Sequence, residues 1–207
     1  MKIAIIGAGN VGATLGKRFA EVGNEVFYGV RNPSEYDEKE LGGKVGTNAE
    51  ACEDAEIIVL SVPYNVVEDA IKSCGEISGK IVVDATNPLG MTPNGLALTI
   101  GFETSGGEKL QEIIPQSKVV KCFNTTGFEN MLNPVYHGKG IDMFTAGNSE
   151  KGIAMATQLS KEIGFGNVYH FGGNDRFALI EQFAFSWINL AILQKQGRDM
   201  AFTVVRR

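Results

Sequence analysis

Three glycines near the start of the chain have the spacing of a phosphate-binding turn. The segment IAIIGAGNVG places Gly7, Gly9 and Gly12 in G-x-G-x-x-G register, after a short apolar run and before a helical pattern. In such a turn the first glycine permits a tight bend, the second lets the backbone approach a pyrophosphate, and the third lets helix and strand pack closely. The helix then offers free N–H groups and the positive end of its dipole to phosphate oxygens. Because strand, turn and helix agree, the motif predicts a dinucleotide site rather than a glycine turn without a ligand.

The segment EVFYGVRNP indicates which dinucleotide that site takes. A site for NAD carries an acid at the end of the second strand, about 20 residues beyond the glycines, where it accepts from the ribose 2′-hydroxyl. This chain has Gly29, Val30 and Arg31 at that place, and Glu25 lies at the other end of the strand. The planar guanidinium of Arg31 suits a 2′-phosphate. The sequence therefore predicts NADP(H), with a solvated loop residue as the alternative role for Arg31.

Polar residues follow three further apolar runs, where an open parallel sheet binds its ligands. The segments are SVPYNVV (61–67), DATNPLG (84–90) and KCFNTTG (121–127). We expect the first to border the adenosine and ribose half of the cofactor, and the other two to face the nicotinamide. Asn87, Asn124 and Thr125 could hold the carboxamide or the substrate, and each could instead be a turn former.

Short apolar runs alternate with helical patterns along the chain. Strands are predicted at 2–7, 25–30, 56–62, 80–85 and 118–123, with weaker candidates at 142–147 and 167–172, and helices at 10–22, 64–75, 105–114 and 149–164. This alternation predicts an α/β fold, a Rossmann-type doubly wound and mostly parallel sheet. The segment 87–107 is rich in Gly, Pro and Thr, which is typical of a mobile flap. The segment 176–196 predicts a helix that is apolar on most faces, and a subunit interface is its expected cover.

Composition and charge are those of an ordinary soluble protein. The chain has 207 residues, of which 43% are hydrophobic, and a net charge of −5 without a basic block, which argues against a nucleic-acid surface. Three widely spaced cysteines fit reduced thiols. The apolar run before Gly7 is too short for a signal peptide, and no apolar stretch approaches the roughly 20 residues that span a bilayer. We therefore expect a cytoplasmic protein with neither nucleic-acid nor membrane partners.

No side chain stands out as a general acid. None of the five tyrosines is followed four residues later by lysine, and His137 and His170 lack metal-ligand spacing, so neither a catalytic residue nor a metal site is predicted. Ser105 lacks the surroundings of a nucleophile, and with Glu108 it favours a helix cap. Direct hydride transfer between two bound cofactors needs no such group, because alignment and proximity supply the catalysis.

On several of these segments the chain resembles the NADPH-dependent reductases of the 8-hydroxy-5-deazaflavin coenzyme, which are similar in turn to the cytosolic domain of the STEAP metalloreductases. The resemblance covers nearly the whole length and includes IIGAGNVG, YGVRNP, SVPY, VVKCFNTTG, AGNSEKG and the tail LIEQFAFSWINLAILQKQGRDMAF. Val30 stands where the family often has a phosphate-binding Ser, and Glu35 falls near the place of a second cation in some members. The resemblance implies a cofactor role for Gly7, Gly9, Asn10, Val11, Gly12, Arg31 and Pro63. With the neighbouring and strand-end residues, the predicted cofactor site also includes Asn32, Ser34, Ser61, Val62, Tyr64, Asn87 and Asn124.

The favoured function is hydride transfer between NADP(H) and a deazaflavin or flavin-type acceptor. The alternatives are an NADPH-dependent reductase of a small carbonyl, imine or metal substrate, and a non-enzymatic NADP-sensing module. The β-hydroxyacid and pyrroline-carboxylate reductases resemble the N-terminal half, but they need a larger helical C-terminal domain. We expect a single NADP-binding Rossmann domain over 1–207, in which 176–207 forms a C-terminal helical segment for dimerisation and the substrate site. The expected partners are a small-molecule acceptor and a second copy of the chain.

Overall fold

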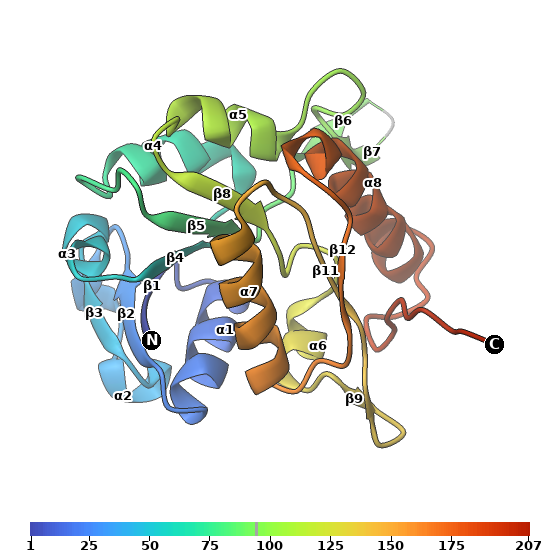
Figure 1. Cartoon of the computed structure of the whole chain (residues 1–207), viewed down its shortest axis with the longest axis horizontal. Helices are drawn as coiled ribbons and strands as arrows, with labels where there is room; N and C mark the ends of the chain where they lie inside the picture. The colour runs from blue at the N-terminus through green and yellow to red at the C-terminus, as the bar shows by residue number, and fades with distance from the viewer. Residues whose placement is uncertain (94) are drawn as a thin grey trace.

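A six-stranded parallel sheet forms the centre of the computed structural model, which describes residues 1–93 and 95–207 (Figure 1). Its strands lie in the order β3-β2-β1-β4-β5-β8, which is the doubly wound order of a Rossmann fold. Neighbouring strands are parallel throughout. The strands are β1 (Lys2–Ile6), β2 (Glu25–Gly29), β3 (Lys44–Gly46), β4 (Ile57–Leu60), β5 (Ile81–Asp84) and β8 (Lys118–Lys121). The predicted fold class is confirmed.

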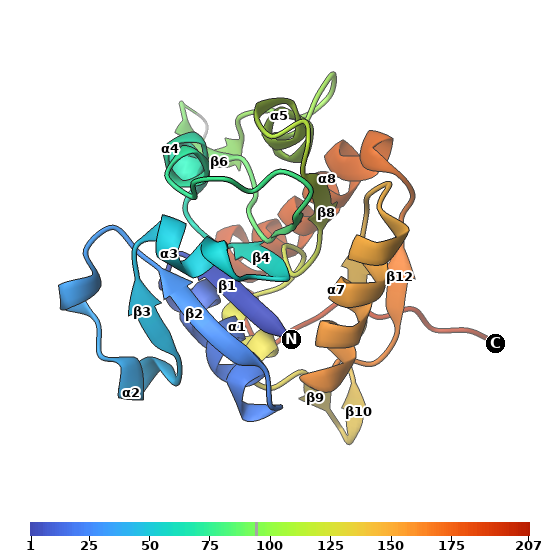
Figure 2. The same ribbon diagram turned by 60° about the vertical axis from the view of Figure 1, so that its left-hand side comes forward.

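Helices cover both faces of this sheet, as Figure 2 shows. Alternate side chains of each strand point to opposite faces, so Ile3 and Ile5 of β1 belong to one apolar cluster and Ala4 and Ile6 to the other. The first cluster is closed by α1 (Asn10–Glu21), α6 (Phe128–Leu132) and α7 (Glu150–Glu162). The second is closed by α3 (Asn48–Glu53), α4 (Val67–Lys72) and α5 (Gly106–Ile113). Because both faces are covered, the central strands are apolar at almost every position, which is why the sequence reveals them.

The segment between Arg31 and β4 holds elements that the sequence patterns miss. It contains the 3₁₀ turn η1 (Pro33–Glu35), α2 (Glu38–Leu41), edge strand β3 and helix α3. These elements are short and carry few apolar residues, so no period develops. Helix α3 begins at a capping box, in which the Thr47 hydroxyl accepts from the Glu50 amide and the Glu50 carboxylate accepts from the Thr47 amide.

The segment 87–107, whose composition predicts a mobile flap, contains regular secondary structure. It contains an antiparallel hairpin of β6 (Leu89–Thr92) and β7 (Gly95–Leu98), and Asn94 between them lies outside the described residues. Two further small sheets follow in the chain. They are the hairpin of β9 (Val135–Tyr136) with β10 (Lys139–Gly140), and the parallel pair of β11 (Met143–Thr145) with β12 (Val168–His170). The parallel pair confirms the two weaker strand predictions.

The C-terminal segment is helical to residue 193. The turn η3 (Asn174–Arg176) leads into α8 (Phe177–Ile188), which continues as one stretch of π-helix, η4 (Asn189–Leu193). These 20 residues are long and apolar enough to cross a membrane by length and composition, so the expectation that no stretch approaches a span is corrected. Polar residues interrupt the apolar run in the sequence and hide its length. A core helix meets the same criterion, and α8 packs against α5. Exposed leucines remain on its outer side, among them Leu179, Leu190 and Leu193.

Candidate functional site

The glycine turn is held by contacts that leave no room for a side chain at Gly7 or Gly12. Gly7 has a φ of 95°, which favours glycine, and its amide donates to the carbonyl of Gly29 over 2.9 Å. A Cβ on Gly12 would lie 1.9 Å from the Gly7 carbonyl oxygen, so only glycine lets α1 approach the strand this closely. The Ser61 hydroxyl donates to the Gly7 carbonyl oxygen over 3.0 Å, which fixes the end of β4 to the turn.

The N-terminus of α1 is open toward the carboxyl edge of the sheet. Gly9 is the N-cap, and no side chain among the described residues bonds to the first turn, which contains Asn10 and Val11. A Cβ on Gly9 would meet nothing within 4 Å. The helix therefore presents unpaired N–H groups to open space beside Gly9, and an anionic pyrophosphate fits both the space and the dipole.

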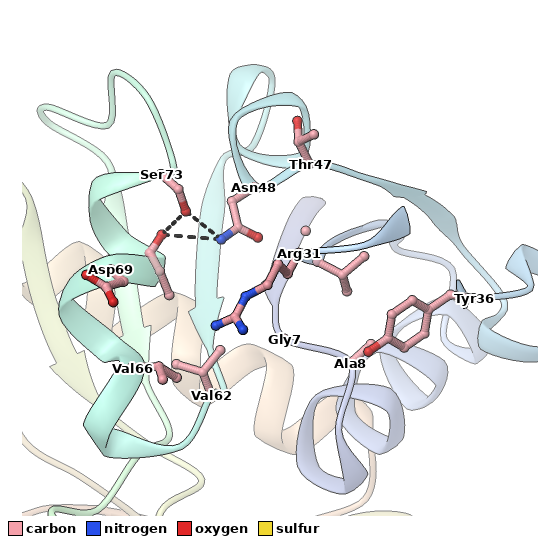
Figure 3. Close-up of a pocket in the computed structure, with 13 residues that line it drawn as sticks. Gly7, Ala8, Arg31, Tyr36, Thr47, Asn48, Val62, Val66, Asp69 and Ser73 are labelled. Atoms are coloured by element: carbon pink, nitrogen blue, oxygen red, sulfur yellow. Dashed lines mark hydrogen bonds between the residues drawn. The ribbon is translucent and has the colours of Figure 1, made fainter. Parts of the chain in front are cut away.

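A cavity of about 410 Å³ lies between this turn, the end of β2 and helices α3 and α4 (Figure 3). Its lining is Gly7, Ala8, Gly29, Val30, Arg31, Tyr36, Thr47, Asn48, Val62, Val66, Asp69, Ala70 and Ser73. Of the predicted cofactor residues, the structure brings Gly7, Arg31 and Val62 together here. The contributions from α3, α4 and the Tyr36 loop are not apparent in the sequence, because they come from elements that carry no recognisable motif.

Arg31 extends into the cavity from the end of β2, toward the α4 side (Figure 3). In the described part of the chain it has neither a hydrogen-bond nor an ion-pair partner, so its charge is free to meet an anion. Asn32 and Ser34 do not line the cavity. The Asn32 amide donates to the Glu35 carboxylate over 2.8 Å, and Ser34 is exposed. The Asn32 side chain therefore faces Glu35, and the structure brings neither Asn32 nor Ser34 to the cavity.

Asn87 and Asn124 meet where β5 and β8 end, as the sequence order of these strands suggests. The Asn87 amide donates to the Asn124 carbonyl over 2.8 Å, and the Asn124 amide donates to Asn87 Oδ1 over 3.0 Å. Phe123, which precedes Asn124, has a φ of 65°, an unusual conformation for a bulky residue. Its buried ring packs edge-on against Phe19, with centroids 5.9 Å apart. The core thus holds the strained turn that directs Asn124 toward Asn87.

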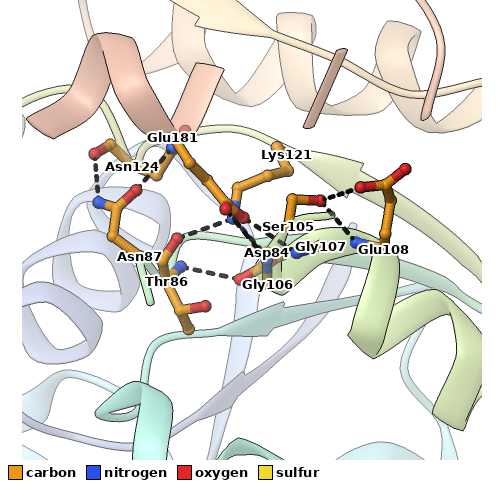
Figure 4. A network of polar contacts seen from close by, with 10 residues as sticks. All are labelled: Asp84, Thr86, Asn87, Ser105, Gly106, Gly107, Glu108, Lys121, Asn124 and Glu181. Atoms are coloured by element: carbon orange, nitrogen blue, oxygen red, sulfur yellow. Dashed lines mark hydrogen bonds and ion pairs between the residues drawn. The ribbon is translucent and has the colours of Figure 1, made fainter. Parts of the chain in front are cut away.

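Three buried charges lie at the ends of the same two strands (Figure 4). Lys121 Nζ donates to Asp84 Oδ2 over 2.9 Å and to Glu181 Oε1 over 2.8 Å, and all three side chains are at most 1% exposed. The Glu181 carboxylate also accepts from the amides of Gly106 and Gly107, the first residues of α5. Burial alone lowers the pKa of Lys121, but the charges of Asp84 and Glu181 outweigh it, so the pKa lies above its ordinary value.

Pro63 and Tyr64 lie beyond the cavity, in the turn that leads into α4. Tyr64 borders a second cavity of about 430 Å³ with α5, and its ring lies over Gly106, where a Cβ would be 2.8 Å away. Burial raises the pKa of Tyr64, and the charges of Glu181 and Asp84 raise it further. Of the predicted site residues, the structure therefore brings Gly7, Arg31 and Val62 together at the cavity and Asn87 and Asn124 together where β5 and β8 end, while Tyr64 lies apart from both groups.

Sequence reasoning missed the buried charges entirely. Asp84 and Lys121 are charged residues that directly follow two valines at the ends of two buried strands, which is a signal that each needs a partner. Glu181 is a similar exception in an apolar helix, but nothing in its position indicates the other two. His170 is exposed, with Nδ1 3.5 Å from the Thr145 hydroxyl. Ser105 caps α5 by accepting from the Glu108 amide, as predicted. Within the described ranges no group of three potential metal ligands gathers.

Comparisons with known proteins agree with this geometry. Residues 2–88 match the family model described as NADP oxidoreductase, coenzyme F420-dependent. The F420-dependent NADP reductases of Methanothermobacter marburgensis and Methanocaldococcus jannaschii are each 28% identical to the chain, over 93% and 94% of both sequences. A crystal structure from Arthrobacter sp. FB24, described as a candidate F420-dependent NADP reductase, is 28% identical and superposes with a TM-score of 0.91 over the full length of both chains. An imine reductase of Streptomyces aurantiacus shares the fold, with a TM-score of 0.66 at 16% identity over 64% of its length. Over nearly its whole length the chain is thus similar to coenzyme F420-dependent NADP reductases, and its first 88 residues match the family model of these oxidoreductases from residue 2 onward.

Proposed function

We propose that this protein transfers a hydride between NADP(H) and a deazaflavin coenzyme of the F420 type. The observation that carries the proposal is the cavity beside the glycine turn, in which Arg31, without a partner among the described residues, lies at the strand end that holds an acid in NAD-binding proteins. The names of the two curated relatives support the same activity.

The glycine turn and the cavity fit the phosphate-bearing half of NADP(H). The open space beside Gly9 takes the pyrophosphate on the N–H groups of Asn10, Val11 and Gly12. The cavity takes the adenosine, and Arg31 pairs with the 2′-phosphate. Val30 is buried and apolar, so it neither accepts from a ribose 2′-hydroxyl nor repels a phosphate.

The Asn87–Asn124 pair orients the nicotinamide half. Asn124 is 3% exposed, and its Oδ1 is a buried acceptor without a partner among the described residues. A carboxamide N–H₂ is a donor of the kind that this oxygen lacks. The chain's part in the reaction is to bind and align the two ring systems and to exclude water, because the nicotinamide supplies the hydride chemistry when bound.

The decisive test is anaerobic oxidation of NADPH by the purified protein, followed by absorbance. We expect rapid turnover with a deazaflavin coenzyme and little turnover with FMN, FAD or a panel of small imines and carbonyls. Binding of NADPH should be measured separately by titration. Turnover of an imine without any deazaflavin would contradict the proposal, and binding without turnover of any acceptor would favour a sensing module.

Assembly and location follow as finer parts of the proposal. The exposed leucines of α8 and η4 support a C2 homodimer built on this helix, because a large apolar face favours burial against a second copy. Three buried and free cysteines are consistent with a reducing compartment, and we place the protein in the cytoplasm. The fold likeness to imine reductases and reductive aminases, at 14–19% identity for the compared chains, supports no second function.

A further inference from the structure

One residue that lines the cavity beside Arg31 carries a buried hydrogen-bond acceptor without a partner among the described residues. This atom is Oδ1 of Asn48, at the start of α3, and it makes no hydrogen bond to the described residues. Asn48 lines the cavity, and Figure 3 shows its side chain between Arg31 and Ser73. A buried acceptor that stays unpaired costs free energy, so the site favours a ligand that brings a donor.

The orientation of the Asn48 side-chain amide is fixed by the hydrogen bonds of its nitrogen, Nδ2. Nδ2 donates to the Ala70 carbonyl oxygen over 3.3 Å and to the Ser73 hydroxyl over 2.8 Å. A carbonyl oxygen can only accept, so the nitrogen must face Ala70 and the oxygen must face the opposite way. The free atom is therefore an acceptor, and an exchange of the two amide atoms would place oxygen against oxygen.

Gly29 at the end of β2 provides the space for this oxygen. A Cβ on Gly29 would lie 2.7 Å from Asn48 Oδ1, which is closer than the Cβ atom of a real side chain comes to a neighbouring atom. The missing side chain places the acceptor directly over the strand end, beside the residues that border the adenosine half. The lining also includes the apolar side chains of Val62 and Val66, a surface against which a flat ring can pack.

We propose that Asn48 reads the base of the cofactor by accepting a hydrogen bond from the 6-amino group of adenine. This inference rests on the proposed NADP(H) function. The 6-amino group is the only donor on the adenine ring, because the ring nitrogens accept. A 2′-phosphate brings no donor to the site when it is fully ionised, and Arg31 is its partner. Asn48 is thus a specificity residue for the base, in a cavity where Arg31 is a specificity residue for the phosphate.

The test compares NADPH with reduced nicotinamide hypoxanthine dinucleotide phosphate, in which a carbonyl oxygen replaces the 6-amino group and the ring's donor moves to the neighbouring N1. Dissociation constants are measured by titration without any electron acceptor. We expect the wild-type protein to bind NADPH about tenfold more tightly than the analogue, because the analogue puts an acceptor against an acceptor. Asn48→Leu should bind the two cofactors equally, and the exposed control Asn133→Leu should keep the wild-type preference.

Asn48→Leu is nearly isosteric and leaves no orphaned carbonyl, because the Ala70 oxygen also accepts from the Ser73 hydroxyl over 2.7 Å. The unfolding midpoint checks its fold, and Asn48→Ala provides a second variant that adds no volume. Equal binding of both cofactors by the wild type would overturn the inference. So would a preference that survives in both Asn48 variants, or an equal weakening of NADPH and the analogue, which would assign the oxygen to a ribose hydroxyl. Failure of the wild type to bind NADPH at all would instead remove the proposed function, and this inference with it.

Discussion

Lys121 Nζ and Glu181 Oε1 lie 2.8 Å apart in the interior, although 60 positions separate the two residues in the chain. Lys121 ends the last strand of the central sheet, and Glu181 comes from the C-terminal helix α8. Their contact joins the sheet, the start of α5 and the C-terminal helix through charges that solvent does not screen.

Removal of one member of this buried set should be strongly destabilising. Glu181→Leu leaves the Lys121 ammonium with the Asp84 carboxylate and the Thr86 carbonyl oxygen, and it frees two amides of α5, so we expect a loss of about 3–5 kcal/mol in the free energy of unfolding. Urea denaturation measures it. Lys72→Met is the control, because its ion pair with Glu68 is exposed, and its unfolding midpoint should hardly change. A small effect of Glu181→Leu would mean that water or a rearranged Asp84 replaces the carboxylate.

Substitutions at two glycines of the turn should distinguish an effect on NADPH binding from an effect on stability. Gly12→Ala places a Cβ 1.9 Å from the Gly7 carbonyl oxygen, so we expect a lower unfolding midpoint together with weaker binding of NADPH. Gly9→Ala meets nothing within 4 Å, so its midpoint should stay near the wild-type value while NADPH binding falls. Thermal unfolding and cofactor titration on both variants provide the comparison. Normal binding by Gly9→Ala would place the pyrophosphate elsewhere.

Arg31 should determine the preference for NADPH over NADH. A charge-assisted hydrogen bond contributes roughly 1.5–3 kcal/mol, so Arg31→Ala should weaken NADPH binding about tenfold to a hundredfold and leave NADH nearly unchanged. Arg31→Glu should reverse the preference, because it restores an acid at the strand end. Glu35 is held by Asn32 nearby and opposes the phosphate, so the wild-type preference is expected to be modest. Equal weakening of both cofactors by Arg31→Ala would assign the residue to adenine or to the fold.

The homodimer proposal is tested on the outer side of the C-terminal helix. Leu179 and Leu190 are 50% and 37% exposed and lie 11 residues apart, about three helical turns. Replacement of both by Glu should convert a dimer into a monomer in analytical ultracentrifugation at micromolar concentration. Val22→Glu is the control, since Val22 is 38% exposed but lies at the far end of α1. A wild-type monomer would refute the proposal.

Asp142 should make the attachment of the C-terminal segment sensitive to acid. Its carboxylate accepts from the Thr203 hydroxyl, from the Val204 amide, and from the amide and side chain of Asn167. Burial raises the pKa of Asp142, but these hydrogen bonds outweigh it, so the pKa lies below its ordinary value of 3.8. The stabilisation is thus complete above pH 3.8 and is lost as the pH falls through the lower pKa of the folded state. Asp142→Asn should lower stability at neutral pH and reduce this dependence, measured by denaturation between pH 2 and 6. An unchanged pH profile would contradict the assignment.

The predictable part of the molecule is the part whose pattern comes from burial. Strands such as β4 (Ile57–Leu60) are enclosed on both faces and therefore read as continuous apolar runs, and the glycine turn has a fixed spacing. Edge strand β3 (Lys44–Gly46) has three residues and no period, so it and α3 were missed. For the same reason the sequence does not predict Asn48 as a site residue, because its place in the cavity depends on how α3 packs rather than on any local motif. The partners of Lys121 are not predicted for a related reason. Asp84 and Glu181 are 37 and 60 positions away in the chain, and no sequence pattern indicates that they contact Lys121.

The position of Glu181 also bears on the order in which the chain folds during synthesis. Strands β1 and β4 and helix α1 need no residue beyond the first third of the chain for their mutual contacts, and this half of the sheet can form early. Asp84 and Lys121, by contrast, remain without their third partner until 60 further residues have left the ribosome. A nascent chain that stops between these points has strands β5 and β8 with an incomplete polar interior, and the closing of that half of the sheet awaits the arrival of α8.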